Sequence, residues 1–315
     1  MSNAESTHPA PIHDRRSLLL GLVGAAASAS IGCSHAAAPS AHAAAPPAKG
    51  ALSMAFVISK DAEVLDFCGP LEVFANASTP DGSPLFAPYM VADDLSPVRV
   101  SGGMRVVPDH AFASAPQPKI IVIPAQSEPS TAMLDWIREA SRGAELTMSV
   151  CNGAFVLAKT GLLDGKSATA HHGGYFRFAA TFPNVLLRRG ARFVEEGRLA
   201  TAGGVSSGID LALRVVERYA GKQQAADIAD IMEYQSEGWL KADSNEAYAK
   251  MPPFDDARPL CPVCFMLGDR SISTVYKDKT YYFCALEEKQ FFTAHTDVFE
   301  RFLSEDMRPS TRMAD

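Results

Sequence analysis

Short, continuously apolar runs that alternate with helical segments constrain the fold of this 315-residue chain most strongly. Residues 54–58 and 120–124 are such runs, and each suits a strand that is buried on both faces of a sheet. Residues 146–150 are expected to form a third strand. Between the last two, residues 131–142 place their apolar side chains on one helical face. Strands that alternate with helices predict an α/β fold, in which helices sandwich a mostly parallel sheet.

The same alternation continues through the middle of the chain. Residues 64–76 are expected to be a loop that enters a helix. Two further helices are expected at 153–160 and 209–219, and a strand at 199–202. Pro70 suits the first turn of its helix, because proline lacks an N–H that this turn would leave unpaired anyway. The α/β domain is therefore expected to span residues 51–241.

The N-terminus has the parts of a bacterial export signal, which are a charged start, a short apolar run and a tail of small residues. The charged start contains Arg15 and Arg16, which suggest the twin-arginine route. The apolar run is shorter than the ~20 residues of a membrane-spanning helix. Residues 1–33 are therefore expected to direct export, and the protein is expected in the periplasm or anchored to the envelope of a bacterium.

Two cleavage sites fit this signal. Residues 30–33 resemble a lipobox, and cleavage there would leave Cys33 to carry a lipid anchor to the membrane. Cleavage near Ala43 would instead leave a soluble periplasmic protein. In either case residues 34–50, which are rich in alanine and proline, are expected to form a linker.

The composition argues against a nucleic-acid partner. Charged residues make up 21% of the chain, the net charge is −7, and no stretch forms a polybasic surface. Hydrophobic residues make up 47%, which is enough for a sizeable core. The expected partner is therefore a small-molecule substrate or ligand.

Cys151 stands where the apolar run 146–150 passes directly into a helix. This position places its side chain at the carboxyl ends of the strands, where α/β folds bind ligands. It also places the sulfur near a helix N-terminus, which favours the nucleophilic thiolate. The alternative is a buried cysteine that acts as a small hydrophobic residue.

Three segments around these elements resemble the ThiJ/PfpI superfamily, namely residues 64–74, 150–165 and 201–210. They are most similar to its branch that contains isonitrile hydratase and the sensor-like domains of some AraC-type regulators. The resemblance covers nearly all of residues 51–240. It implies a flavodoxin-like sandwich (class I glutamine amidotransferase-like), usually a homodimer, with a reactive Cys151 and no cofactor required by this domain.

The resemblance also implies roles for residues near Cys151. Asp66 matches the acidic residue that the family places beside the cysteine, where a carboxyl can act as a general base or share a proton; the alternative is helix capping. His171 matches a pocket histidine, or is an ordinary loop residue. Asn152 follows the cysteine directly, and no histidine stands there, which argues against a peptidase. Ala125 and Gln126 replace a Gly-Gly pair that can form an oxyanion hole.

A second, cysteine-bearing module is expected at residues 257–305, after a polar linker at 242–256. Cys261 and Cys264 are spaced for a tight turn and Cys284 follows an expected strand, as in small metal sites. The module resembles the YHS domain, a small metal-binding domain. With Glu288 or His295 as fourth ligand, such a site would suit zinc or copper. The alternative is a module without metal, in which Cys261 and Cys264 are oxidised.

Two functions fit the sequence. The first is an enzyme in which Cys151 and Asp66 add water to a small electrophile such as an isonitrile, and this reading is favoured. The second is a non-enzymatic envelope sensor or binding protein for a metal, an oxidant or a small ligand. No helix-turn-helix pattern follows residue 240, which disfavours a DNA-binding regulator.

Overall fold

The computed structural model describes residues 50–306. The predicted export signal, the Cys33 anchor and nearly all of the linker at 34–50 lie outside the described residues. Within the described part of the chain, no helix combines the length and apolarity that a membrane span requires.

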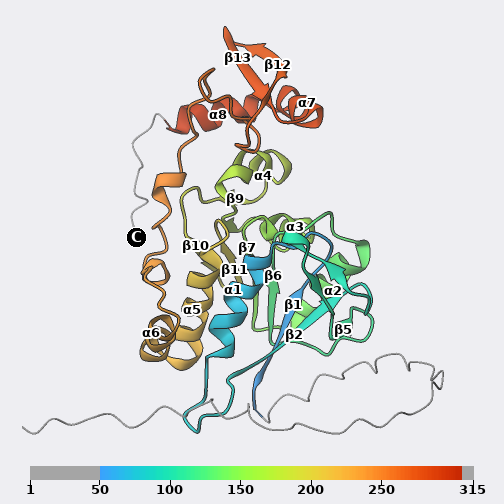
Figure 1. Cartoon of the computed structure of the whole chain (residues 1–315), viewed down its shortest axis with the longest axis vertical. Coiled ribbons are helices and arrows are strands. Elements are labelled where there is room, and N and C mark those ends of the chain that lie inside the picture. Colours follow the sequence, from blue (N-terminus) through green and yellow to red (C-terminus); the bar gives the residue numbers. More distant parts are fainter. Residues whose placement is uncertain (1–49, 307–315) are drawn as a thin grey trace, which may run out of the picture. The chain divides into compact units, whose positions relative to one another are not determined.

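A seven-stranded sheet forms the centre of the α/β domain (Figure 1). Its strands lie in the order β10-β11-β7-β6-β1-β2-β5, and all neighbours are parallel except β10 and β11. The strands are β1 (Leu52–Val57), β2 (Phe86–Ala92), β5 (His110–Ala111), β6 (Ile120–Ile123), β7 (Leu146–Val150), β10 (Phe193–Glu196) and β11 (Leu199–Ala202). The predicted mostly parallel sheet is confirmed, although β2, β5 and β10 carry no clear signal in the sequence.

Helices cover both faces of this sheet (Figure 1). One face is covered by α1 (Val64–Ala75), α5 (Ser207–Ala220) and α6 (Lys222–Ile231), and the other by α2 (Thr131–Gly143), α3 (Gly153–Lys159) and α4 (Tyr175–Thr181). Side chains of β1 alternate between the two cores, since Met54 and Phe56 belong to the first and Ala55 and Val57 to the second. The α/β sandwich expected from the sequence is therefore present.

Pro70 corrects one expectation about α1. The helix begins at Val64, so Pro70 lies inside it and not in its first turn. A proline there removes one helical hydrogen bond. Pro70 is buried against α5, where its Cγ would lie 3.3 Å from a Cβ on Gly208. Burial of α1 against α5 offsets the lost hydrogen bond, and the sequence pattern does not reveal this contact.

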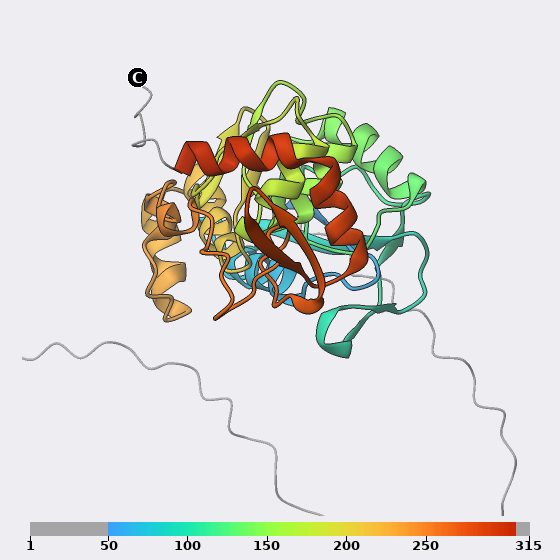
Figure 2. The same cartoon turned by 90° about the horizontal axis from the view of Figure 1, so that it is seen from above.

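The C-terminal segment contains a hairpin of β12 (Asp269–Tyr276) and β13 (Lys279–Phe283), followed by α7 (Leu286–Ala294) and α8 (Thr296–Asp306). Lys277 and Asp278 turn the hairpin with positive φ angles of 49° and 61°. Figure 2 shows the hairpin beside α7, in orange and red. The short elements elsewhere are β3 (Val98–Arg99), η1 (Ser101–Gly103), β4 (Arg105–Val106), β8 (Ser167–Ala168), η2 (His172–Gly174), β9 (Leu186–Leu187), η3 (Gly238–Leu240) and η4 (Glu246–Tyr248).

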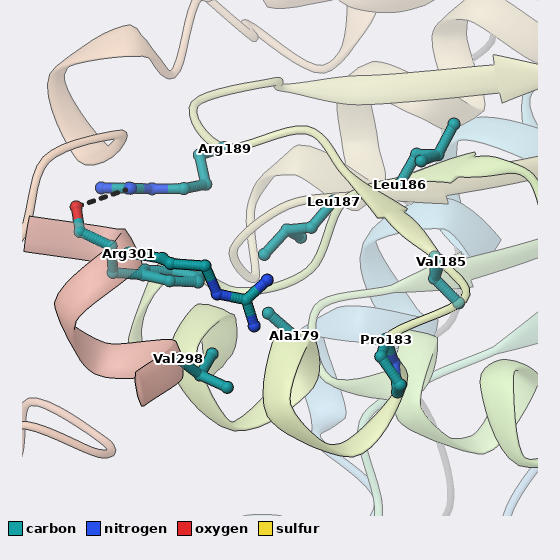
Figure 3. A pocket seen from close by; sticks show the side chains of 9 residues that line it. Ala179, Pro183, Val185, Leu186, Leu187, Arg189, Val298 and Arg301 are labelled. Carbon is teal, nitrogen blue, oxygen red and sulfur yellow. Dashed lines mark hydrogen bonds between the residues drawn. The ribbon is translucent and has the colours of Figure 1, made fainter. Parts of the chain in front are cut away.

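Helix α4 completes the hydrophobic core of this C-terminal segment. Phe176 of α4 is 1% exposed and lies in the same cluster as Phe292 and Phe299, with its ring centroid 5.5 Å from that of Phe299. Nearby, Arg189 donates to the main-chain oxygen of Phe302 at 3.4 Å and covers its ring (Figure 3). The core of this segment is therefore shared with α4 and is not formed by the segment alone.

The expected linker at 242–256 also contacts the α/β domain. Asn245 is buried, accepts a hydrogen bond from Arg192 Nη1 at 3.1 Å and donates to Ser207 Oγ at 3.2 Å. The main-chain oxygen of Ala242 accepts from the Arg192 N–H at 2.6 Å. The segment thus connects the two parts and packs on the first of them.

Replacing Phe176 with alanine is expected to destabilise the C-terminal segment by about 3–5 kcal/mol, as is typical when a buried Phe is truncated. Limited proteolysis should then cleave after residue 241 faster than elsewhere. Phe178→Ala, on the same helix but buried in the α/β core, is the matched control. Equal protection of the C-terminal segment in both variants would contradict the shared core.

Candidate functional site

The strand-to-helix turn after β7 holds Cys151 in a left-handed conformation with φ of 58°, which is uncommon for a non-glycine residue. Its N–H donates to the main-chain oxygens of Ala202 at 3.1 Å and Gly203 at 2.9 Å, which ties the turn to the end of β11. Gly153 is required next, because a Cβ there would lie 2.1 Å from the Ile123 oxygen. The elbow predicted from the sequence is confirmed in its geometry.

Asp66 lies in the first turn of α1 with no exposed surface. Its Oδ2 accepts a hydrogen bond from the Ala125 N–H at 2.9 Å, and the Ala125 oxygen accepts from the Glu63 N–H at 2.8 Å. These bonds join the start of α1 to the end of β6. Asp66 therefore does not cap its helix, since its hydrogen bond leaves the helix and Glu63 occupies the N-cap position.

The second oxygen of Asp66, Oδ1, is buried without a nitrogen or oxygen donor among the described residues. The carboxyl interacts instead with the Cys151 thiol, which stabilises the carboxylate form. The structure thus brings together the two residues that the sequence assigned to the reaction.

Burial controls the protonation of this pair. Burial, with a smaller contribution from the nearby Glu63 charge, raises the pKa of Asp66 to about 7. Burial also raises the pKa of Cys151, and the Asp66 charge raises it further. The expectation that the helix N-terminus would favour a thiolate is not met, because desolvation is the larger effect at a sulfur that is 5% exposed. Near neutral pH the pair therefore holds at least one proton.

Main-chain N–H groups of Asn152 and Val205 are directed at the Cys151 sulfur, and both lower its pKa. They come from the two turns that follow β7 and β11. The N–H of Ala125 is already engaged by Asp66. The donors that can stabilise negative charge on sulfur are therefore supplied by the elbow and the β11–α5 turn, and not by the position of the family's Gly-Gly pair.

A pocket of about 250 Å³ lies next to the pair. Val205, whose N–H is directed at the Cys151 sulfur, lines it. Leu65, which precedes Asp66 in the sequence, lines it as well. The other lining residues are His171, His172, Tyr175, Arg192, Gly204, Ser206, Asn245 and Tyr248. The pocket is therefore lined by neighbours of both acids, whereas the buried Cys151 and Asp66 are not themselves among its lining residues.

His171 is a pocket residue, as the resemblance implied. Its Nδ1 accepts a hydrogen bond from the Gly173 N–H at 3.1 Å, so the neutral ring carries its proton on Nε2. Burial, together with the neighbouring His172, lowers the pKa of His171 to about 4. At neutral pH the pocket therefore presents an uncharged histidine.

Asn152 is exposed and borders a second pocket, of about 320 Å³. Its Oδ1 lies 2.7 Å from the position of a Cβ on Gly174, so this glycine gives the amide its space. Lys159 of α3 and Arg177 of α4 also line this pocket. Asn152 is thus placed to contact a ligand, on the side facing α4.

Sequence reasoning missed part of the first pocket. Arg192, which directly precedes β10, lines it, as do Asn245 and Tyr248 from the segment expected to be a linker. Arg192 donates to the fully buried Asp210, which fixes its guanidinium. The Gly203-Gly204 pair was a usable signal for the turn whose Val205 N–H is directed at Cys151. A Cβ on Gly204 would lie 3.1 Å from His171 Cδ2, so glycine leaves room for the histidine there. No comparable signal marks Arg192.

Cys261, Cys264 and Cys284 form a cluster whose sulfurs all lie within 4.8 Å of one another. The first two flank a tight turn, in which the Phe265 N–H donates to the Cys261 oxygen at 2.8 Å, and Cys284 directly follows β13. A hydrogen bond from Cys264 lowers the pKa of Cys261. The layout expected from the sequence is confirmed, and three close cysteines can bind a metal.

The two candidates for a fourth ligand differ. His295 is stacked on Phe291 at 4.2 Å, its Nδ1 is within 2.8 Å of the Phe291 oxygen, and it is outside the cluster. Glu288 accepts a hydrogen bond from Arg177 at 2.6 Å and lies close enough to Cys284 for its charge to raise the pKa of that thiol. Glu288 is also outside the cluster, but its charge reaches Cys284, so it is the better placed of the two.

All five described cysteines are free thiols. Cys68 is half-buried against the first core, so it does not trap Cys151 in a disulfide here, and Cys261 and Cys264 are not joined.

Replacing Asp66 with asparagine is expected to lower the pKa of the Cys151 thiol, because the carboxylate charge that opposes thiolate formation is removed. The rate of Cys151 alkylation by iodoacetamide, followed against pH by mass spectrometry, measures this. Cys68 in the same samples is the internal control. An unchanged or higher Cys151 pKa would show that the two acids do not interact in this way.

Comparison with known proteins identifies the α/β domain. Residues 52–218 match the DJ-1/PfpI family. Isonitrile hydratase of Pseudomonas putida is 33% identical over 214 residues, which are 66% of this chain and 84% of that protein. The transcriptional regulator CdhR of Pseudomonas aeruginosa is 29% identical over 46% of this chain, which spans only 44% of the regulator.

Solved structures agree on the fold. A ThiJ/PfpI family protein from Pseudomonas syringae has a TM-score of 0.54 and 24% identity over 62% of this chain and 84% of its own. DJ-1beta of Drosophila melanogaster has a TM-score of 0.51 and 21% identity over 59% of this chain and 100% of its own. With more than half of its residues matched by the family, the chain belongs to the DJ-1/PfpI family.

Proposed function

We propose that the protein is a cysteine-dependent enzyme that adds water to a small neutral electrophile, of which an isonitrile is the favoured example. The observation that carries this proposal is the buried Cys151–Asp66 pair, which holds a proton near neutral pH beside a small pocket. The similarity to isonitrile hydratase supports it. The pocket also suits an uncharged substrate, because His171 is neutral and the Arg192 charge is paired with Asp210.

The first chemical step joins Cys151 to the substrate. The Cys151 sulfur bonds to the terminal carbon of an isonitrile, R–N≡C, while the shared proton moves to the same carbon. The product is a thioimidate, R–N=CH–S–Cys151. Asp66 with a pKa of about 7 can give that proton when protonated and receive the thiol proton when ionised.

The second step releases the product. Water adds to the thioimidate carbon and transfers a proton to Asp66. Asp66 passes this proton to the nitrogen, which gives R–NH–CH(OH)–S–Cys151. The C–S bond then breaks as the C=O bond forms, and the hydroxyl proton goes to the Cys151 sulfur. The net reaction is R–N≡C + H₂O → R–NH–CHO, and no oxidant or reductant is needed. The N–H groups of Asn152 and Val205 stabilise the sulfur as it leaves.

The purified protein is expected to convert cyclohexyl isocyanide to its formamide, followed by chromatography. Cys151→Ser should abolish turnover, whereas Cys68→Ser should retain it. If protonated Asp66 supplies the proton, kcat/KM should fall as the pH rises through about 7. Absence of formamide, or turnover by Cys151→Ser, would contradict the proposal.

The C-terminal segment at 257–305 is proposed to be a YHS-like module that holds one Zn²⁺ or copper(I) ion. Thiolates around zinc at about 2.3 Å lie ~3.8 Å apart in a tetrahedral site. The Cys264 and Cys284 sulfurs are 3.4 Å apart and all three lie within 4.8 Å, so the donors fit such an ion. Bound metal would supply folding free energy and local charge.

Cobalt(II) binding tests the metal proposal, because thiolate ligation gives cobalt an intense near-ultraviolet absorption. The full chain is expected to bind one cobalt, and zinc should displace it. Cys284→Ser should weaken binding at least tenfold, with Cys68→Ser as the control. A reduced protein that binds neither cobalt nor copper(I) would rule the site out.

A second candidate function is a sensor at the cell envelope. The three-cysteine cluster favours this function, because it lies beside α4, the helix that also lines the pocket bordering Asn152. The similarity to a transcriptional regulator favours it as well. In this case the protein would bind metal or a small ligand without turnover. On either function we propose export of a homodimer to the periplasm, with Cys33 as the lipid anchor if the lipobox-like site is cleaved.

A further inference from the structure

One segment touches both the cysteine cluster and the pockets near Cys151. It runs from His171 through η2 and α4 to Thr181. At its start, a Cβ on Gly173 would lie 2.8 Å from the Cys264 main-chain oxygen. Farther along the segment, the Arg177 guanidinium donates a hydrogen bond to the Glu288 carboxylate at 2.6 Å. The segment therefore contacts the metal-site turn at one point and the candidate fourth ligand at another.

Arg177 itself belongs to the pocket that borders Asn152. Its guanidinium lies 4.1 Å over the Phe291 ring of α7, and the Glu288 carboxylate neutralises its charge. The side chains of Arg177 and Glu288 are 35% and 20% exposed, so this ion pair is partly shielded from solvent. Glu288 stands four residues after Cys284, in the first turn of α7.

We propose that Arg177 and the metal compete for Glu288, so that metal binding releases the Arg177 guanidinium into the pocket beside Asn152. This inference rests on the proposed metal site. In one state Glu288 pairs with Arg177; in the other its carboxylate completes a three-thiolate site, as a four-coordinate zinc ion with three cysteines requires. The two states differ in a defined contact, which is what coupling between two sites needs.

The released guanidinium changes the charge near the nucleophile. Asn152 follows Cys151 and borders the same pocket as Arg177. An arginine without its carboxylate partner adds a positive charge there, which favours anionic over neutral reactants. Metal at the cluster is thereby linked to the selectivity of the α/β site, although no ligand of the metal comes from that domain.

Cobalt titration of the full chain against a competing chelator is the first test. Arg177→Gln is expected to tighten cobalt binding about fivefold, because a partly exposed ion pair no longer competes. Glu288→Gln should weaken it about tenfold, and adding Arg177→Gln to that variant should change nothing further. Lys159→Gln, at the other cation of the pocket, is the matched control and should bind as the wild type does.

Alkylation of Cys151 is the second test and does not depend on turnover. The ratio of its rates with iodoacetate and iodoacetamide reports local charge, because thiol ionisation cancels in the ratio. Zinc should raise this ratio severalfold in the wild type and in Lys159→Gln but not in Arg177→Gln.

The failures can be told apart. A wild type that binds no cobalt or zinc removes the metal site itself. If the wild type binds metal but Arg177→Gln binds it no more tightly, the metal site stands and the competition for Glu288 is overturned. The same conclusion follows if the rate ratio of the wild type does not change with zinc.

Discussion

Two weak acids, the Asp66 carboxyl and the Cys151 thiol, are buried in one site that cannot hold both negative charges. Raising the pKa of Asp66 from 3.8 to about 7 means that ionisation costs roughly 4 kcal/mol more than in water. The unfolded chain releases this proton at lower pH, so the native state loses stability as the pH rises from about 4 to 7. The fold therefore holds a proton between these two buried side chains near neutral pH.

The rest of the α/β domain holds this pair in place. The Ala125 main chain bonds to both Asp66 and Glu63, and the Cys151 N–H bonds to the end of β11. Helix α4 extends the arrangement, because Phe176 joins the C-terminal core while Arg177 reaches Glu288. The cysteine cluster at residues 261–284 is thereby packed against η2 and α4, which adjoin Asn152.

Much of this could be predicted from the sequence, because buried strands and elbow turns follow local rules. The strand at Leu146–Val150 and the Cys151 elbow are local features, and so is the turn between Cys261 and Cys264. Long-range packing was not predictable. Nothing near Arg192 or Phe176 in the sequence shows that one lines a pocket and the other anchors a distant segment. The protonation of Cys151 also depends on burial, which opposes the helix N-terminus.

Infrared difference spectroscopy of the reduced protein tests the shared proton most directly. The carbonyl stretch of a protonated carboxylic acid should disappear as the pH rises through about 7, and should be absent from Asp66→Asn. Alkylating Cys151 with iodoacetamide should shift this band, because the sulfur is the carboxyl's neighbour. An acid band that titrates at the ordinary carboxyl pKa, or that ignores alkylation of Cys151, would contradict the account.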